Sequence, residues 1–381
     1  MKDITIILLL LFGLCTVAGG QEIFEYEDAE KTIISGLTES GRSSSTTTLI
    51  IPSGVRAVRA NALSGACATA LVVNASSISF GEQSGSGVSE GQFVQINFSN
   101  ATDGVSMASV ISGLGSLFSE EGIIEIEGLG GCGGSINLSS VLRGKGGVRV
   151  IMPASLVRDY NKEDFNFGEY SGEELDYDCA QVYGRFVLST DVGTFCGSAK
   201  FRDSDDGSNF LFYVPTGVTS AGGDKQVHVQ RVSHIETGQG VIIHNELNTA
   251  GEADLPRYNG ELSYEDLSRY GSSMLVGTLA PTPLSETDGD KTNMILYNGL
   301  FYKTSGGTLG ANKAYLQIPT VDLPASGKMS MYVEEESEST LVAHPYSGVG
   351  SVFSGAYTLS GLRVAGDYRG IVIKDNKKIK R

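Results

Sequence analysis

Two glycine-spaced motifs contain residue types that enzymes use. Gly87, Ser89 and Gly91 match the G-x-S-x-G spacing of a nucleophile elbow, in which the serine stands on a tight turn between a strand and a helix. Here the motif closes a Gly- and Ser-rich run at 81–91, and a strand pattern at 93–98 follows it, so neither neighbouring element is in place. We therefore predict a loop and no acyl-transfer serine.

The second motif has the spacing of a dinucleotide-binding fingerprint. Gly128, Gly130 and Gly133 match G-x-G-x-x-G after a strand-like run. That fingerprint needs a helix opening at the third glycine, so that its first N–H groups face a pyrophosphate. The run before Gly144 is too short for this helix, and no acidic residue closes the next strand-like run at 148–151. We predict turn glycines and no bound cofactor.

Three histidines could in principle form a zinc site. His228 and His234 share one face of an alternating strand, and His244 lies on the next strand candidate. Six residues along a strand span about 20 Å, so His228 and His234 cannot share one metal ion. We expect solvent-facing strand histidines and no zinc.

Acidic turns suggest calcium more weakly. Asp203, Asp205 and Asp206 precede Gly207, but the glycine stands one place early for an EF-hand loop and position twelve is Val214. The interpretation as a turn is better here, and also at 288–290. Loose calcium binding at such turns stays an open alternative.

The first twenty residues predict export. A mostly apolar run at 4–18 follows Lys2, and Ala18 and Gly20 stand at the small-residue positions that a signal peptidase needs before Gln21. The chain has 381 residues, but no later run approaches the roughly 20 apolar residues of a membrane helix, so we expect no transmembrane span. The net charge of −16 argues against nucleic acid, because phosphate binding needs clustered Lys and Arg. We expect a secreted or outer-surface protein.

Four cysteines follow the export signal. Even numbers in an exported chain permit disulfides, and Cys179 and Cys196 flank a predicted strand pair closely enough to form one. Cys67 and Cys132 each follow a repeat turn, where we favour a small buried thiol over a bridge, although their disulfide state stays open.

The elements of the first half recur with a regular period. Short β-branched triplets begin near residues 49, 71, 94, 123 and 148, at intervals of 22 to 29 residues. A period in this range predicts a solenoid, in which each unit buries its apolar face only against its neighbours. Such a stack offers an extended strand face and no deep pocket. In the best-formed unit we expect a buried layer made by Leu49, Ile51, Val55, Val58, Ala62 and Leu63.

This unit also carries a family resemblance. The segment IPSGV at 51–55, a Val three residues later, NALSGAC at 61–67 and a following Leu71 resemble the BspA-like leucine-rich repeat of Bacteroidetes surface proteins. Leu63 replaces the usual Phe and Arg59 the usual Gly. The resemblance implies a short, degenerate leucine-rich-repeat-like domain over 21–161 that mediates adhesion. The acidic run at 162–181 reads as a linker.

The second half is rich in short strand candidates. Eight runs separated by Gly, Pro, Asp and Asn predict a β-sandwich or barrel over 182–333. The phrase LYNGLFYKTSGGTLGANKAYLQIP at 296–319 resembles the β-rich module that follows repeats in many Bacteroidetes exported proteins. After a linker at 334–354, residues 355–381 offer three strands, and they are similar to the C-terminal sorting segments of the type IX secretion route.

Together these patterns predict a mostly β, non-enzymatic binding protein with no cofactor. Its expected partners are host extracellular or bacterial surface proteins or glycans, bound on the solenoid strand face, whose residues the sequence does not identify. A glycan-capture or enzyme-associated module and a purely structural envelope protein stay open as alternatives. The acid pair Glu173 and Glu174 falls in the predicted linker, which weakens the enzyme alternative.

Overall fold

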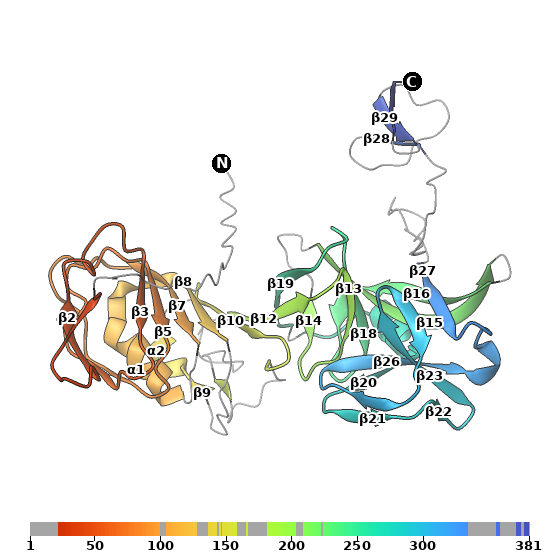
Figure 1. Cartoon of the computed structure of the whole chain (residues 1–381), viewed down its shortest axis with the longest axis horizontal. Helices are drawn as coiled ribbons and strands as arrows, with labels where there is room; N and C mark the ends of the chain where they lie inside the picture. Colours follow the sequence, from red (N-terminus) through yellow and green to blue (C-terminus); the bar gives the residue numbers. More distant parts are fainter. Residues whose placement is uncertain are drawn as a thin grey trace.

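The chain folds into two β-rich units that lie side by side and are joined through a shared sheet (Figure 1). The computed structural model describes residues 22–99, 104–127, 136–142, 145, 147–157, 165–166, 181–202, 209–221, 224–258, 260–333, 356–358, 371–374 and 377–380. Strands dominate these residues, so the mostly β prediction is confirmed. Among them, no helix is long and apolar enough to cross a membrane.

The first unit is built on a sheet whose parallel strands follow one another in chain order. Six parallel strands and a final antiparallel strand lie in the order β3 (Thr48–Ile51), β5 (Ala70–Val73), β7 (Phe93–Phe98), β8 (Phe118–Ile126), β10 (Arg149–Pro153), β12 (Gln181–Leu188) and β19 (Gly251–Pro256). The predicted triplets at 49, 71, 94, 123 and 148 all fall in or beside these strands. Each triplet therefore contributes one strand to this sheet.

A smaller sheet and two helices cover the inner side of this large sheet. The sheet has the order β1 (Phe24–Tyr26), β2 (Ile33–Leu37), β4 (Ala57–Val58) and β6 (Ser79–Phe80), and the helices are α1 (Gly104–Leu114) and α2 (Ser139–Leu142). The 3₁₀ turn η1 (Gly115–Leu117) and the pair β9 (Ile136–Asn137) and β11 (Phe165–Asn166) complete the unit. All six apolar residues predicted for the layer around Leu49 are buried.

The second unit is a nearly closed, barrel-like sheet. Its strands follow the order β13 (Val192–Phe195), β18 (Val241–Asn245), β15 (Phe210–Ala221), β16 (Asp224–Val232), β27 (Lys328–Val333), β24 (Leu300–Lys303), β23 (Lys291–Tyr297), β26 (Lys313–Pro319) and β20 (Leu275–Thr278), with β22 (Thr287–Asp288) beside β23. The ends approach where Thr194 Oγ1 donates to the Ala314 carbonyl at 2.9 Å and Asn312 Nδ2 donates to the Cys196 carbonyl at 3.1 Å. Apolar side chains such as Met294, Phe301 and Leu316 fill the interior, so the barrel encloses a packed core.

Two short strand pairs, a helix and a 3₁₀ turn lie around the barrel. They are the pair β14 (Phe201–Arg202) and β17 (His234–Ile235), the pair β21 (Thr282–Leu284) and β25 (Gly307–Leu309), helix α3 (Tyr264–Gly271) and the turn η2 (Thr320–Asp322). A separate three-stranded sheet near the C-terminus contains β28 (Ala356–Thr358), β29 (Ile371–Lys374) and β30 (Lys377–Lys380). The three strands expected there are present, and most of both predicted linkers lies outside the described residues.

The two units meet at β12, which we had expected to open the second module. Val182 pairs with Val150 of β10 in parallel register, and β12 pairs on its other side with β19, which returns from the second unit. Beneath this joint the rings of Phe186 and Phe195 lie 4.8 Å apart, and those of Phe186 and Phe201 lie 5.0 Å apart. One hydrophobic core therefore runs from the first unit through the joint to the wall of the barrel.

That barrel wall is apolar on both faces. Along β15, Phe210 and Phe212 point into the joint core, whereas Leu211 and Tyr213 point into the barrel. A strand buried on both faces reads as a continuous apolar run. This explains why FLFYV at 210–214 shows no alternation in the sequence.

Candidate functional site

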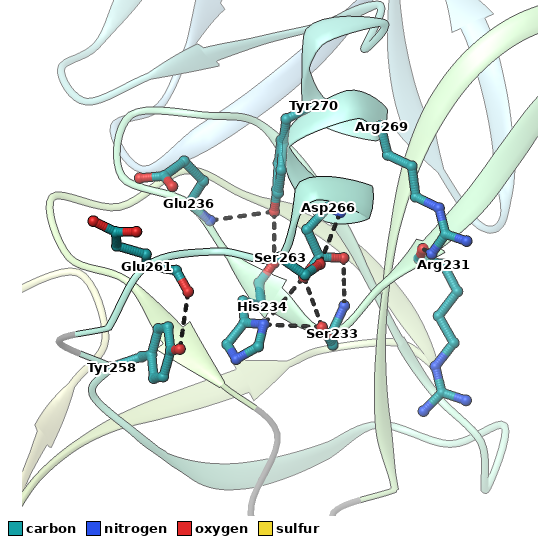
Figure 2. A network of polar contacts seen from close by, with 10 residues as sticks. All are labelled: Arg231, Ser233, His234, Glu236, Tyr258, Glu261, Ser263, Asp266, Arg269 and Tyr270. Carbon is teal, nitrogen blue, oxygen red and sulfur yellow. Dashed lines mark hydrogen bonds and ion pairs between the residues drawn. The ribbon is translucent and has the colours of Figure 1, made fainter.

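A polar network at the start of helix α3 contains the residue types of a catalytic triad (Figure 2). Ser263 caps the helix by accepting the Asp266 N–H at 3.0 Å. The Asp266 side chain is 3% exposed and accepts hydrogen bonds from the Ser233 N–H at 3.1 Å and the Ser233 hydroxyl at 2.6 Å. It also lies 3.1 Å from Nδ1 of His234. Serine, histidine and aspartate are thus in mutual contact.

Their arrangement does not form a proton relay. Ser233 Oγ lies 2.9 Å from Nδ1 of His234, the same nitrogen that faces Asp266. A catalytic serine and aspartate contact opposite ring nitrogens, so that the imidazole can pass a proton between them. Here the serine and the aspartate contact the same nitrogen, Nδ1. The hydrogen bonds of the network instead hold helix α3 against the residues that follow β16.

Tyr270 completes this attachment. Its hydroxyl donates to the His234 carbonyl at 2.9 Å and accepts the Glu236 N–H at 3.2 Å. Burial raises the pKa of Tyr270 far above its usual range, so the phenol stays a neutral donor. The His234 ring also lies 4.3 Å from the Tyr258 ring. His234 is therefore a packed, hydrogen-bonded residue, and our expectation of a solvent-facing histidine was wrong at this position.

The other predicted metal candidates do not converge. His228 stacks on Tyr332 with ring centroids 5.8 Å apart, and His244 lies on a different strand, β18. Within the described residues, no three His, Cys, Asp or Glu side chains are grouped to hold a metal ion. Residues 288–290 form the predicted turn, a two-residue hairpin loop between β22 and β23 with Gly289 at a φ of +61°. The aspartates at 203–206 lie outside the described residues.

The two glycine motifs have different outcomes. Gly87 and Gly91 occupy left-handed turns with φ of +80° and +68°, and Ser89 is exposed in the loop between β6 and β7. The loop prediction is confirmed for the G-x-S-x-G motif. The G-x-G-x-x-G segment at 128–133, like the acid pair at 173–174, lies outside the described residues.

The cysteines are only partly described. Cys196 is fully buried, and burial raises the pKa of its thiol to about 11. Cys179 and Cys132 lie outside the described residues, so the predicted Cys179–Cys196 disulfide stays a prediction. Cys67 is exposed and its thiol lies 3.4 Å from the Arg42 carbonyl, so the expected burial of this side chain was wrong. Its neighbours Ala66 and Ala68 supply the buried layer instead.

An open groove of about 620 Å³ runs along the C-terminal end of α1. It contains Glu90 and Glu120, both exposed, and Lys145, whose ammonium donates to the Phe118 carbonyl at 2.8 Å. Burial lowers the pKa of Lys145. A glycosidase acid needs a desolvated carboxyl group, which these exposed glutamates do not provide. The groove therefore lacks the desolvated acid that a glycosidase needs.

The outer face of the sheet in the first unit is a second candidate surface. Along β3, Leu49 and Ile51 are buried while Ile50 between them is 53% exposed, so alternate residues point outward. Strand register aligns one outward residue from each successive strand in a single row, which we call the face row: Ile50, Val72, Asn97, Glu125, Ile151 and Tyr183. Five strand spacings of about 4.8 Å make this row roughly 24 Å long.

One arginine on this face pairs with two carboxylates. Arg185 donates through Nε and one terminal nitrogen to both oxygens of Asp254 at 2.7 and 2.8 Å, and to Glu125 at 3.0 Å. Glu125 lies two strands from β12, so the Arg185 side chain must cross β10, which explains why the outward Ile151 is only 6% exposed. The neighbouring carboxylates raise the pKa of Arg185 further above its usual range, chiefly through the Asp254 hydrogen bond.

Asn97 extends the polar part of the row. Its amide nitrogen donates to Glu125 at 3.1 Å and to Glu127 at 2.9 Å, and because carboxylates can only accept, this fixes the amide orientation. Its carbonyl oxygen Oδ1 is buried and has no hydrogen-bond partner among the described residues. Sequence patterns could not have identified this cluster, since its members come from strands that are far apart in the chain.

Comparison with known proteins identified no relative of this chain. No protein-family model matches the chain, and neither a curated protein nor a solved structure matches it.

Proposed function

We propose that this chain is a secreted or cell-surface binding protein without enzymatic activity, and that it adheres to host or bacterial surface macromolecules through the outer face of its parallel sheet. The observation that carries the proposal is the face row, which extends for roughly 24 Å across six strands. An extended strand face is the surface on which solenoid proteins bind their partners.

The composition of the face row supports contact with a macromolecule. One end is apolar, with Ile50 53% exposed beside Val72, and the other carries Tyr183. Between them the carboxylate of Glu125 is already paired with Arg185, so a partner covering it strands no isolated charge. An apolar, partly aromatic surface with internally paired charges is typical of protein-binding faces.

The strand order supports the finer proposal of a leucine-rich-repeat-like solenoid. Consecutive strands are parallel neighbours, and the apolar residues of the IPSGV and NALSGAC segments point into the stack. In this proposal the resemblance to BspA-like surface proteins extends over 21–161. The C-terminal strands β28 to β30 would then belong to a type IX sorting segment.

The non-enzymatic assignment is supported by the arrangement of the candidate acids and nucleophiles. The Ser233, His234 and Asp266 cluster lacks relay geometry, and the glutamates of the α1 groove are exposed. Both groups thus have a structural explanation.

The test is a pull-down with the chain immobilised, using fibronectin, fibrinogen, collagen and intact bacterial cells as probes. We expect retention of at least one probe at micromolar concentration. The double variant Ile50→Arg with Val187→Arg should lower its affinity about tenfold or more, because both side chains are exposed on strands of the open sheet, Val187 by 71%. The matched control is Val105→Arg on helix α1, where the side chain is 80% exposed, and it should bind normally.

Two outcomes would contradict this function. Retention of no probe at micromolar concentration would favour the structural envelope alternative. An equal loss of affinity in Val105→Arg would show that added positive charge, and not the face row, weakens the contact.

A further inference from the structure

A second exposed surface lies on the barrel, away from the face row. Strand register brings six outward side chains together on β16, β27, β24 and β23, and we call them the aromatic patch: His228, Ile295, Tyr297, Leu300, Tyr302 and Tyr332. The alternate residues on the same strands, such as Phe301 and Met329, point into the barrel core. The outward set is thus fixed by the packing of the inward one.

The rings of the aromatic patch lie in two contacting pairs. Tyr297 and Tyr302 are in edge-to-face contact with centroids 6.4 Å apart, and His228 stacks on Tyr332 at 5.8 Å. Tyr297 is 64% exposed, Tyr332 48% and Ile295 36%. Rings that touch along one edge and stay exposed on the other present flat apolar surfaces with polar hydroxyl tips.

The patch also differs from the rest of the molecule in charge. The chain has a net charge of −16, yet the outward positions at 226–230, 293–297, 300–302 and 328–332 contain no carboxylate. Polar, uncharged groups border the rings, where Gln226 donates to Ser330 at 3.0 Å. Lys328, opposite Tyr302, is the nearest charged side chain in register. This composition fits an uncharged ligand that combines apolar faces with many hydroxyl groups.

The size of the patch argues against a protein partner. A wholly buried Tyr contributes about 150–250 Å². Tyr297, Tyr332 and Ile295 are about one third to two thirds exposed and the other three side chains less, so the patch offers on the order of 400 Å². A stable protein interface needs about 800 Å² from each partner. A second copy of the chain would therefore be held too weakly by this surface, whereas a few sugar rings cover it completely.

We propose that the aromatic patch binds a neutral glycan. The C–H faces of hexopyranose rings stack on the tyrosines, because the ring faces are negative and the C–H groups slightly positive. The tyrosine hydroxyls, Gln226 and Ser330 supply donors and acceptors for the sugar hydroxyls. This site is separate from the face row, so each can fail without the other.

Affinity electrophoresis of the chain in native gels tests the proposal, with mixed-linkage β-glucan, xyloglucan, galactomannan and soluble starch as neutral probes and alginate as the anionic one. We expect retardation by at least one neutral polysaccharide and not by alginate. The variant Tyr297→Ala with Tyr332→Ala should raise the dissociation constant about tenfold or more, and Tyr297→Phe with Tyr332→Phe, which keeps both rings, should change it less than about threefold. Tyr264→Ala is the matched control, because this tyrosine is 89% exposed on helix α3.

Several results would overturn the inference. Absence of retardation in all four neutral gels excludes a neutral-glycan site, and retardation by alginate alone would assign binding to charge at Lys328. If Tyr264→Ala lowered the affinity for the polysaccharide as much as Tyr297→Ala with Tyr332→Ala, the aromatic patch would not be the binding site. A dimer that dissociates in Tyr297→Ala with Tyr332→Ala, measured by sedimentation, would show that a second copy covers this surface.

Discussion

Replacing Arg185 by Met removes the ion pairs that tie the two units together. Arg185 stands on β12, and its partners Glu125 and Asp254 stand on β8 and β19, so the group joins three strands of the shared sheet. Methionine keeps much of the apolar stem that covers Ile151 but removes all three charged hydrogen bonds. The two carboxylates, on strands separated by β10 and β12, are then left without a counter-charge.

The cost follows from the burial of the three side chains. Those of Glu125, Arg185 and Asp254 are 12%, 24% and 30% exposed. Breaking a fully buried pair costs about 3–5 kcal/mol, whereas exposed pairs contribute about 0–1 kcal/mol. At this intermediate burial, after screening, we expect Arg185→Met to lower the free energy of unfolding by about 2–3 kcal/mol.

The chain contains a control ion pair with a similar bidentate geometry whose side chains are more exposed, 54% for Arg59 and 41% for Glu27. Arg59 donates through Nε to both oxygens of Glu27 at 2.9 and 3.0 Å, and a terminal nitrogen adds a bond of 2.7 Å. Solvent screens this pair, so Arg59→Met should leave stability unchanged within error. Urea unfolding followed by circular dichroism compares the variants, and Arg185→Lys should recover part of the loss. Equal effects of Arg185→Met and Arg59→Met would refute the reasoning that burial determines the cost.

Three further predictions concern single buried positions. Cys196 is a free thiol in the structure, and iodoacetamide at pH 8 should label Cys67 and leave Cys196 unmodified in peptide maps, since burial raises the Cys196 pKa from 9.0 to about 11. The stability that its neutral thiol contributes should be present below about pH 9 and lost as the pH rises through 11. Gly184→Ala should lower the free energy of unfolding by about 1–3 kcal/mol in thermal unfolding, because the new Cβ would lie 2.4 Å from the Phe201 ring. A Cβ at Gly54 would meet nothing within 4 Å, so Gly54→Ala should have a far smaller effect. Asp266→Ala should lower the free energy of unfolding in urea by about 1–3 kcal/mol, because it removes the charged acceptor of the Ser233 N–H and hydroxyl, and an unchanged midpoint would contradict the attachment role of the network.

The sequence predicted the elements with a strong local pattern. Each of the eight strand candidates at 182–333 contains a strand, and the buried layer around Leu49 is as expected, because alternation and turn residues act over a few neighbours. Helix α1 was missed although Met107, Val110, Ile111 and Leu114 have helical spacing. Helix α3 was missed although Ser263 and Asp266 form a capping pattern, since the helix is short and has little apolar surface of its own.

Strand β19 could not have been predicted from local sequence patterns, and the same holds for the residues of the candidate surfaces. Its outward residues Glu252 and Asp254 are acidic, and Leu255 is its fully buried anchor, so no strand pattern is visible until β12 lies beside it. Asp254 is held by Arg185, which the sequence places 69 residues away. The face row and the aromatic patch share this character, because which residues stand side by side on them is set by the register between paired strands. A period in the sequence can therefore predict that a strand face exists, whereas the residues that occupy it follow only from which strands become neighbours.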